Sequence, residues 1–204
     1  MAGLDPARVR ANLERVREQI GDAVEICAAI KYVEGDDLPA LAEAGITLVG
    51  ENRAQDLAAK QDEHGELFEW DFIGALQSRK VKDVAPRVRL IHSLASESAL
   101  AQLEKHPAGE VLVQVNVARE EGKAGITPED LTDFVARCPS PVSGLMTMPP
   151  FTEDPEESRP HFARLAQLAA EHGLERLSMG TSQDYAVAVE EGATIVRLGS
   201  VLYE

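Results

Sequence analysis

The chain has 204 residues, of which 44% are hydrophobic and 27% are charged, and its formal net charge at pH 7 is -15. This length fits one large domain or two small ones, with enough apolar residues for a sizeable core. The negative charge argues against nucleic acid and anionic membranes as partners, because proteins that hold phosphate backbones need a concentrated positive surface. Any bound anion would have to be held locally, by backbone amides or a few basic groups.

Cysteine content and the N-terminal segment indicate a reducing compartment. Cys27 and Cys138 are the only cysteines, which is too few for a disulfide framework, and they lack metal-ligand spacing. The first twenty residues mix acidic and basic side chains and contain no apolar stretch of the kind found in signal peptides. No apolar run approaches the length of a membrane span. We therefore expect a cytoplasmic protein.

Short apolar runs alternate with amphipathic segments along the whole chain. Asp5 and Pro6 are typical of a helix start, and Val9, Val16 and Ile20 follow at helical spacing. The alternation that follows predicts parallel strands joined by crossover helices. The eight predicted strands are 24–30, 46–49, 70–73, 89–92, 111–117, 142–146, 176–179 and 194–198. The helices predicted between them are 37–44, 53–61, 78–84, 96–105, 128–137, 155–172 and 183–190.

Eight strand-helix units without a proline- or glycine-rich linker predict one domain over residues 1–204. This number of units predicts a TIM (β/α)8-type barrel, here with an extra N-terminal helix. An open, doubly wound sheet is the alternative, because both folds use right-handed strand-helix-strand units. In either fold, ligands bind at the carboxyl ends of the strands.

Lys31 stands where the first predicted strand ends. Strand alternation predicts that it shares a face with Ala29 and Cys27, whose small side chains leave room below it, and that Tyr32 points to the opposite face. Two interpretations are open for the lysine. Either its ammonium group simply points to water beyond the end of the strand, or its amine forms a Schiff base with a carbonyl compound.

The loops after the seventh and eighth strands contain small residues suited to phosphate. Gly180, Thr181 and Ser182 precede the helix predicted from residue 183, so we expect their amides to be free, and Gly199-Ser200 follows the last strand. Barrel enzymes frequently hold a phosphate group with these two loops. The alternative is a capping Ser182 and a glycine turn. The position favours a phosphorylated small molecule.

Arg197, near the end of the last strand, connects these two features. A lysine anchor, a phosphate site and an arginine between them describe pyridoxal 5'-phosphate. An arginine that faces the pyridine nitrogen would keep the nitrogen unprotonated, because arginine is always cationic, and an unprotonated ring is a weaker electron sink. The alternative for Arg197 is a structural ion pair with a carboxylate.

Seven short motifs together resemble those of the pyridoxal phosphate homeostasis proteins, the YggS/PROSC family, which is similar to the barrel domain of alanine racemase. They are Gly50-Glu51-Asn52-Arg53, Phe72-Ile73-Gly74 with Leu76-Gln77-Ser78-Arg79-Lys80, Ile91-His92-Ser93, Val113-Gln114-Val115-Asn116, Gly144-Leu145-Met146-Thr147-Met148, Leu177-Ser178-Met179-Gly180 and Val196-Arg197-Leu198-Gly199. The resemblance runs from the lysine strand to the C-terminus.

This resemblance implies a role for each of nine residues. Lys31 would carry the cofactor as an internal aldimine, and Arg197 would face the pyridine nitrogen. Asn52 and Met146 would line the ring. The phosphate end would be formed by Ser178, Gly180, Ser182, Gly199 and Ser200.

Three residues depart from the family pattern. Ile30 and Tyr32 flank the lysine where the family usually has hydroxyl residues, and Thr181 replaces a residue that is usually apolar. The polar surroundings of the Lys31 amine, and hence cofactor exchange, are expected to differ.

The preferred function is a non-catalytic protein that buffers and delivers pyridoxal phosphate. The alternative is an amino-acid racemase or lyase that depends on the same cofactor. Racemisation needs a second acid-base group opposite the lysine, and the context of Tyr32, Tyr185 or Tyr203 marks none of them as that base. The five histidines are scattered, so we expect no metal site. The expected state is a monomer in transient contact with recipient enzymes, with no nucleic acid or membrane partner.

Overall fold

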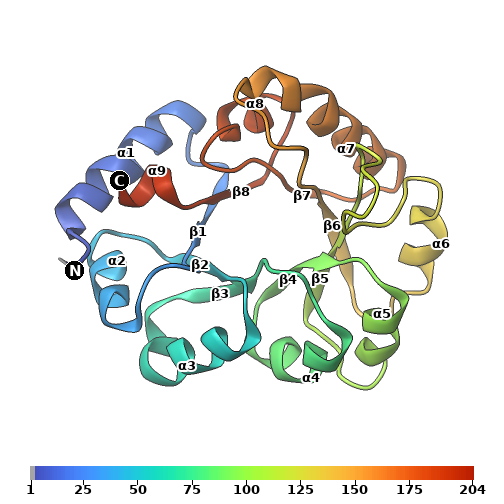
Figure 1. Ribbon diagram of the computed structural model, residues 1–204, viewed down its shortest axis with the longest axis horizontal. Coiled ribbons are helices and arrows are strands. Elements are labelled where there is room, and N and C mark those ends of the chain that lie inside the picture. The colour runs from blue at the N-terminus through green and yellow to red at the C-terminus, as the bar shows by residue number, and fades with distance from the viewer. Residues whose placement is uncertain (1–2) are drawn as a thin grey trace.

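The protein forms a closed barrel of eight parallel strands, whose order around the barrel is their order in the chain (Figure 1). The structure is a computed structural model that describes residues 3–204, so Met1 and Ala2 of the predicted domain lie outside the described residues. The strands are β1 Glu25–Ala29, β2 Leu48–Glu51, β3 Glu69–Phe72, β4 Leu90–Leu94, β5 Glu110–Gln114, β6 Val142–Met146, β7 Arg176–Ser178 and β8 Ile195–Leu198. Since β8 pairs with β1, the TIM-type barrel is confirmed and the open sheet is wrong.

Helices surround the barrel, and the extra N-terminal helix is present. They are α1 Pro6–Ile20, α2 Leu38–Glu43, α3 Ala54–His64, α4 Val81–Val84, α5 Glu97–Leu103, α6 Leu131–Ala136, α7 Arg159–Glu171, α8 Tyr185–Glu190 and α9 Ser200–Tyr203. Short 3-10 turns occur at η1 Gly35–Asp37, η2 Gly65–Leu67, η3 Ser78–Lys80, η4 Ala85–Arg87 and η5 Pro155–Ser158. The sequence did not predict α9.

Helices α6 and α8 are two of several helices that begin later than their sequences predict. Helix α6 begins at Leu131 because Thr127 and Asp130 form a closed turn, in which the Thr127 Oγ1 donates to Asp130 Oδ2 at 2.6 Å. Helix α8 begins at Tyr185 and is preceded by a turn over residues 181–184. The Tyr185 amide closes this turn by donating to the Thr181 carbonyl. In both cases a turn takes the residues that were expected to form the first helical turn.

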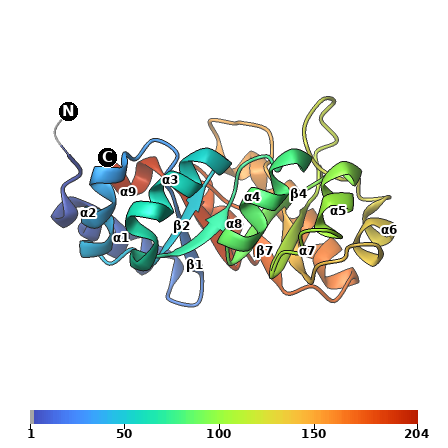
Figure 2. The same cartoon turned by 90° about the horizontal axis from the view of Figure 1, so that it is seen from below.

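Helix α1 joins the beginning of the chain to its end. Asp5 caps this helix by accepting a hydrogen bond from the Ala7 amide at 3.0 Å, and Val9 and Val16 are buried. Asn12, only 5% exposed, donates to the carbonyl of Leu202 in α9 at 3.1 Å. Figures 1 and 2 accordingly show α9 beside α1.

The core has two parts, one outside the barrel and one inside it. The outer part packs the helices onto the strands, and the inner part is a small apolar cluster. This inner cluster contains Cys27, Leu48, Leu90, Leu112, Met146 and Ile195. Because these side chains fill the middle of the barrel, the space for a ligand lies at the carboxyl ends of the strands.

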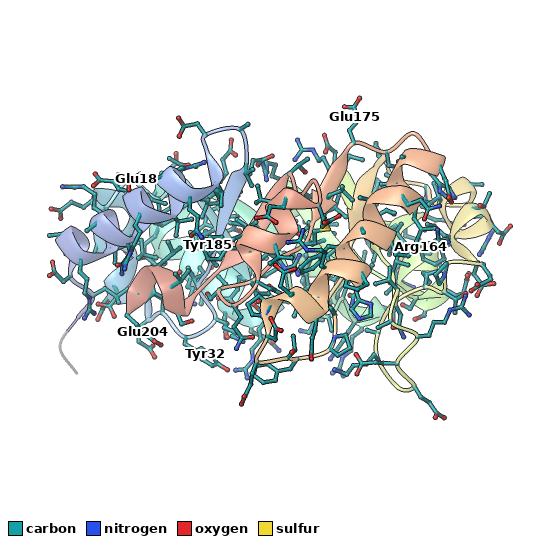
Figure 3. The ribbon with its side chains drawn as sticks, turned by 90° about the horizontal axis from the view of Figure 1, so that it is seen from above. Glu18, Tyr32, Arg164, Glu175, Tyr185 and Glu204 are labelled. Atoms are coloured by element: carbon teal, nitrogen blue, oxygen red, sulfur yellow. The ribbon has the colours of Figure 1, made fainter. Side chains whose placement is uncertain are left out.

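The opposite end of the barrel is crossed by ion pairs. Arg89 contacts Glu25 at 2.6 Å and Asp71 at 2.8 Å, and Arg176 contacts Glu25 at 3.3 Å. Figure 3 separates the two ends: Glu18 and Glu175 lie at one, and Tyr32 and Glu204 at the other. No helix within residues 3–204 is both long and apolar enough to cross a membrane.

Gly144 is required by the close approach of β6 and β7. A Cβ atom at this position would lie 1.9 Å from the carbonyl oxygen of Arg176. We expect Gly144→Ala to lower the free energy of unfolding by about 3 kcal/mol in chemical denaturation, because backbone must move to admit the methyl group. Gly109→Ala is the matched control, since its Cβ would make an ordinary contact at 3.8 Å. Equal stability of the two variants would contradict the close approach.

Candidate functional site

A cavity of about 580 Å³ opens at the carboxyl ends of the strands. Its walls come mainly from the segments after β1 and β8, with contributions after β2, β3, β6 and β7. Six of the nine predicted site residues line it: Lys31, Asn52, Ser182, Arg197, Gly199 and Ser200. Residues widely separated in the sequence therefore meet at one site.

The other three predicted residues do not line this cavity. Met146 is 2% exposed and belongs to the apolar cluster inside the barrel. Ser178 is fully buried in β7, where other side chains use its hydroxyl. Gly180 has a φ of +92° and packs under α8, where a Cβ atom would lie 2.7 Å from that of Ala188.

Lys31 lies in a turn that directly follows β1. The strand ends at Ala29, and the Val33 amide donates to the Ile30 carbonyl at 3.0 Å, which closes the turn. The expectation that Tyr32 points to the opposite face is wrong, because strand alternation stops before this residue. Instead the Lys31 Nζ lies 4.7 Å from the centroid of the Tyr32 ring, and both residues line the cavity.

A buried ion pair holds the backbone on which Lys31 and Asn52 depend. The Lys60 Nζ lies 2.7 Å from both the Glu51 Oε2 and the Ile30 carbonyl oxygen. The Glu51 Oε1 accepts hydrogen bonds from the amide of Asn52 at 2.5 Å and from the next amide at 3.3 Å. Lys60 was not among the predicted site residues; the signal for it in the sequence is the glutamate of the Gly50-Glu51-Asn52-Arg53 motif.

Arg197 brings a buried positive charge to the cavity. It is 5% exposed, and no ion pair among residues 3–204 includes it, so the alternative of a structural ion pair is not observed. Burial lowers the pKa of Arg197 to about 10, which leaves it cationic at neutral pH. Its Nη1 donates to the Ser178 Oγ at 2.5 Å, and its Nη2 donates to the Thr147 carbonyl at 3.0 Å and the Met148 Sδ at 2.9 Å.

Beneath Arg197, three side chains form what we call the buried polar network: Ser178, His92 and Asp71. The His92 Nδ1 lies 2.8 Å from the Ser178 Oγ, and its Nε2 lies 3.0 Å from the Asp71 Oδ2. Burial lowers the pKa of His92, and nearby Arg197 and Arg89 lower it further, against the opposing effect of Asp71. Burial opposes ionisation of Asp71, but hydrogen bonds from His92 and Arg89 lower its pKa overall.

The loops after β7 and β8 contact each other through Ser182. Its Oγ accepts hydrogen bonds from the amides of Gly199 at 3.0 Å and Val201 at 3.4 Å. The expectation of free amides over residues 180–182 is wrong for Thr181, whose amide donates to the Asp184 Oδ1 at 2.7 Å. This difference follows from the turn that replaces the first turn of the predicted helix.

Tyr203 and Met148 also line the cavity, although neither was among the predicted site residues. Tyr203 reaches the cavity through the short helix α9, and its hydroxyl donates to the Ala29 carbonyl at 3.2 Å. Burial raises the pKa of this phenol. Met148 follows the sixth strand within the Gly144 to Met148 motif, which was the available signal.

Asn52, which lines the cavity, has a buried side-chain oxygen that lacks a protein partner in the described part of the chain. The Asn52 Oδ1 is buried, and no hydrogen-bond partner for it exists among residues 3–204. A buried polar group without a partner costs about 1–3 kcal/mol, so this amide favours a ligand that supplies hydrogen bonds. Within the same residues, no group of three or more His, Cys, Asp or Glu side chains could hold a metal ion.

Comparison with known proteins defines the class of this barrel. Residues 4–204 match the family described as "Alanine racemase, N-terminal domain". The pyridoxal phosphate homeostasis protein of Aquifex aeolicus is 37% identical over 97% of this chain and 95% of its own length. That of Pseudomonas aeruginosa is 38% identical over 78% of this chain and 75% of its own. The chain belongs to the family of pyridoxal phosphate homeostasis proteins.

Solved structures agree with this assignment. PipY of Synechococcus elongatus, in a structure described as having PLP bound, has a TM-score of 0.85 and 29% identity, with 96% of this chain and all of that chain covered. Alanine racemase of Corynebacterium glutamicum has a TM-score of 0.76 and covers 98% of this chain, but only 62% of that chain is matched, at 16% identity. The second likeness concerns the fold alone.

Removal of the Lys60 charge should destabilise the protein, because it leaves the fully buried Glu51 carboxylate without its cation. We expect Lys60→Met to lower the free energy of unfolding by about 3–5 kcal/mol in chemical denaturation. Glu51→Gln combined with Lys60→Met should recover part of this loss, since no buried charge then remains. Lys82→Met at an exposed position is the control. A Lys60→Met variant as stable as this control would contradict the role of the ion pair.

Proposed function

We propose that this protein binds pyridoxal 5'-phosphate through a Schiff base to Lys31 and serves the intracellular homeostasis of this cofactor by buffering and delivering it. The observation that carries the proposal is that one cavity is lined both by Lys31 and by Arg197, a buried cation that forms no ion pair within residues 3–204. The names of the relatives and the PLP-bound structure of PipY support the same ligand.

Different residues around the cavity would contact different groups of the ligand. Lys31 would supply the amine that condenses with the aldehyde, with loss of one water molecule. Arg197 would donate to the pyridine nitrogen, and the side-chain Oδ1 of Asn52, which has no partner among residues 3–204, would accept a hydrogen bond from a polar ring substituent. The phosphate end would lie at Ser182, Gly199 and Ser200, where Ser182 already joins the two loops.

Several features favour exchange of the cofactor over its use in turnover. Lys31 is exposed, and the cavity opens to solvent at the end of the barrel without a covering domain among residues 3–204. Water-excluded chemistry needs a closed site, whereas a carrier needs an accessible one. We also propose that the protein acts as a cytoplasmic monomer in transient contact with recipient enzymes.

An amino-acid racemase or lyase is the second candidate, favoured by the position of Tyr203 on the cavity. A racemase needs a base opposite the lysine. The Tyr203 hydroxyl, however, donates to the Ala29 carbonyl, and burial raises its pKa, so it is a poor base at neutral pH. These observations support the carrier.

Lys31→Ala should abolish covalent attachment, because no other amine would be held at the aldehyde. With wild-type protein and pyridoxal phosphate, we expect a visible absorbance band, and borohydride should fix the cofactor to the Lys31 peptide, as measured by mass spectrometry. The exposed Lys105→Ala variant serves as the control and should behave as wild type. Failure of saturated wild-type protein to show either signal would contradict the cofactor assignment.

Loaded protein should leave amino acids unchanged. After incubation with L- or D-alanine in deuterated water, we expect no loss of enantiomeric purity and no deuterium at the α-carbon, measured by chiral chromatography and mass spectrometry. A recipient enzyme supplied in its cofactor-free form should meanwhile gain activity. Racemisation at a useful turnover rate would overturn the carrier in favour of the second candidate.

A further inference from the structure

We infer that the buried polar network of Asp71, His92 and Ser178 positions Arg197 toward the cavity, and that Ser178 supports the ring end of the ligand rather than its phosphate. This inference rests on the proposed function, because it assigns the network to the same pyridoxal phosphate site. Asp71, His92 and Ser178 would be positioning residues, since none of them lines the cavity.

The network crosses the interior of the barrel. Asp71 and His92 belong to β3 and β4, while Ser178 and Arg197 belong to β7 and β8. In Figure 1, β3 and β4 lie across the barrel from β7 and β8. The contact of His92 with Ser178 therefore spans the barrel and links Arg197 to the opposite wall.

The hydrogen bonds of the network fit a single direction of donation. The Ser178 Oγ accepts from the Arg197 Nη1, which leaves the serine proton for the His92 Nδ1. The Nε2 of a neutral His92 then donates to Asp71. An ionised Asp71 can only accept, and Arg89 holds both its oxygens, at 3.0 and 2.8 Å. Each donor thus has one acceptor in a series that begins at Arg197 and ends at Asp71.

This directional series fixes the guanidinium group of Arg197. One Nη atom is held by Ser178, and the other is held by the Thr147 carbonyl and the Met148 thioether. A planar group bonded on both Nη atoms cannot rotate, so its remaining N–H donors keep one direction. Removal of the Ser178 hydroxyl would release one side of this group.

Comparison of two ligands separates this role from a role at the phosphate. Pyridoxal contains the aldehyde and pyridine ring of pyridoxal phosphate but lacks the phosphate group. If Ser178 acts through Arg197, Ser178→Ala should weaken both ligands by a similar factor, roughly tenfold for a hydrogen bond to a charged group. Ser182→Ala should weaken pyridoxal phosphate selectively. The buried but remote Ser140→Ala should change neither affinity.

Absorbance titration of the wild type and these variants with each ligand gives the affinities. A loss confined to pyridoxal phosphate in Ser178→Ala would overturn the inference and return Ser178 to the phosphate end. His92→Gln should weaken both ligands as Ser178→Ala does, and the double variant should lose less than the product of the two factors. If the affinity loss of the double variant equals the product of the two single losses, Ser178 and His92 do not act as one network and the inference is overturned. If the wild type binds neither ligand, the proposed function itself fails.

A measurement without any ligand tests the direction of donation. In protein labelled with 15N-histidine and freed of cofactor, NMR at pH 7 should show a neutral His92 with its proton on Nε2, assigned by the loss of its signals in His92→Gln. An imidazolium, or a proton on Nδ1, would overturn the proposed series of donors. This result does not depend on folding of the Ser178→Ala variant.

Discussion

The buried charge of Arg197 is the constraint on which the rest of the site depends. A cation removed from water is costly unless nearby groups replace its hydration, and no carboxylate among residues 3–204 forms an ion pair with Arg197. Its compensation comes instead from neutral acceptors: a hydroxyl, a carbonyl and a thioether. The carboxylate of Asp71 is the negative charge of the buried polar network, and it is separated from Arg197 by His92 and Ser178. The guanidinium group therefore keeps donors for a ligand that a direct ion pair would have consumed.

The same arrangement explains why polar side chains occupy the interior of a small barrel. Apolar residues such as Cys27 and Met146 fill most of this space, and the buried polar network passes between them from the ion pairs of Arg89 to the cavity. A half-satisfied network would cost more than an apolar core. Here each member has a partner on both sides, so the network adds little cost while it joins four strands.

Much of the fold, and part of the site, could be predicted from the sequence. The eight strands follow from apolar runs, and the carboxyl-end rule places Lys31, Asn52 and Arg197 together without further information. Which face a residue presents could not be predicted, because it depends on where a strand ends. β1 ends at Ala29, so alternation gives the wrong side for Tyr32. Lys60 and His92 act through contacts with residues distant in sequence. The motif that contains His92 and the motif that contains Glu51 could not show which residues these partners are.

The position of the site on β1 and β8 has a consequence for the assembly of the molecule. Lys31 follows the first strand and Arg197 lies in the last, where it pairs with Cys27 of β1. The pairing of β1 with β8, which we call the seam, brings together segments from the two ends of the chain. The entropy lost on closing so long a loop is offset only by the contacts of the intervening strands, so the seam forms once those strands are in place. A partly folded chain that lacks the seam contains neither the cavity nor its anchor in working arrangement. The site is therefore present only in molecules whose barrel is fully closed, and its ligand would selectively stabilise those molecules.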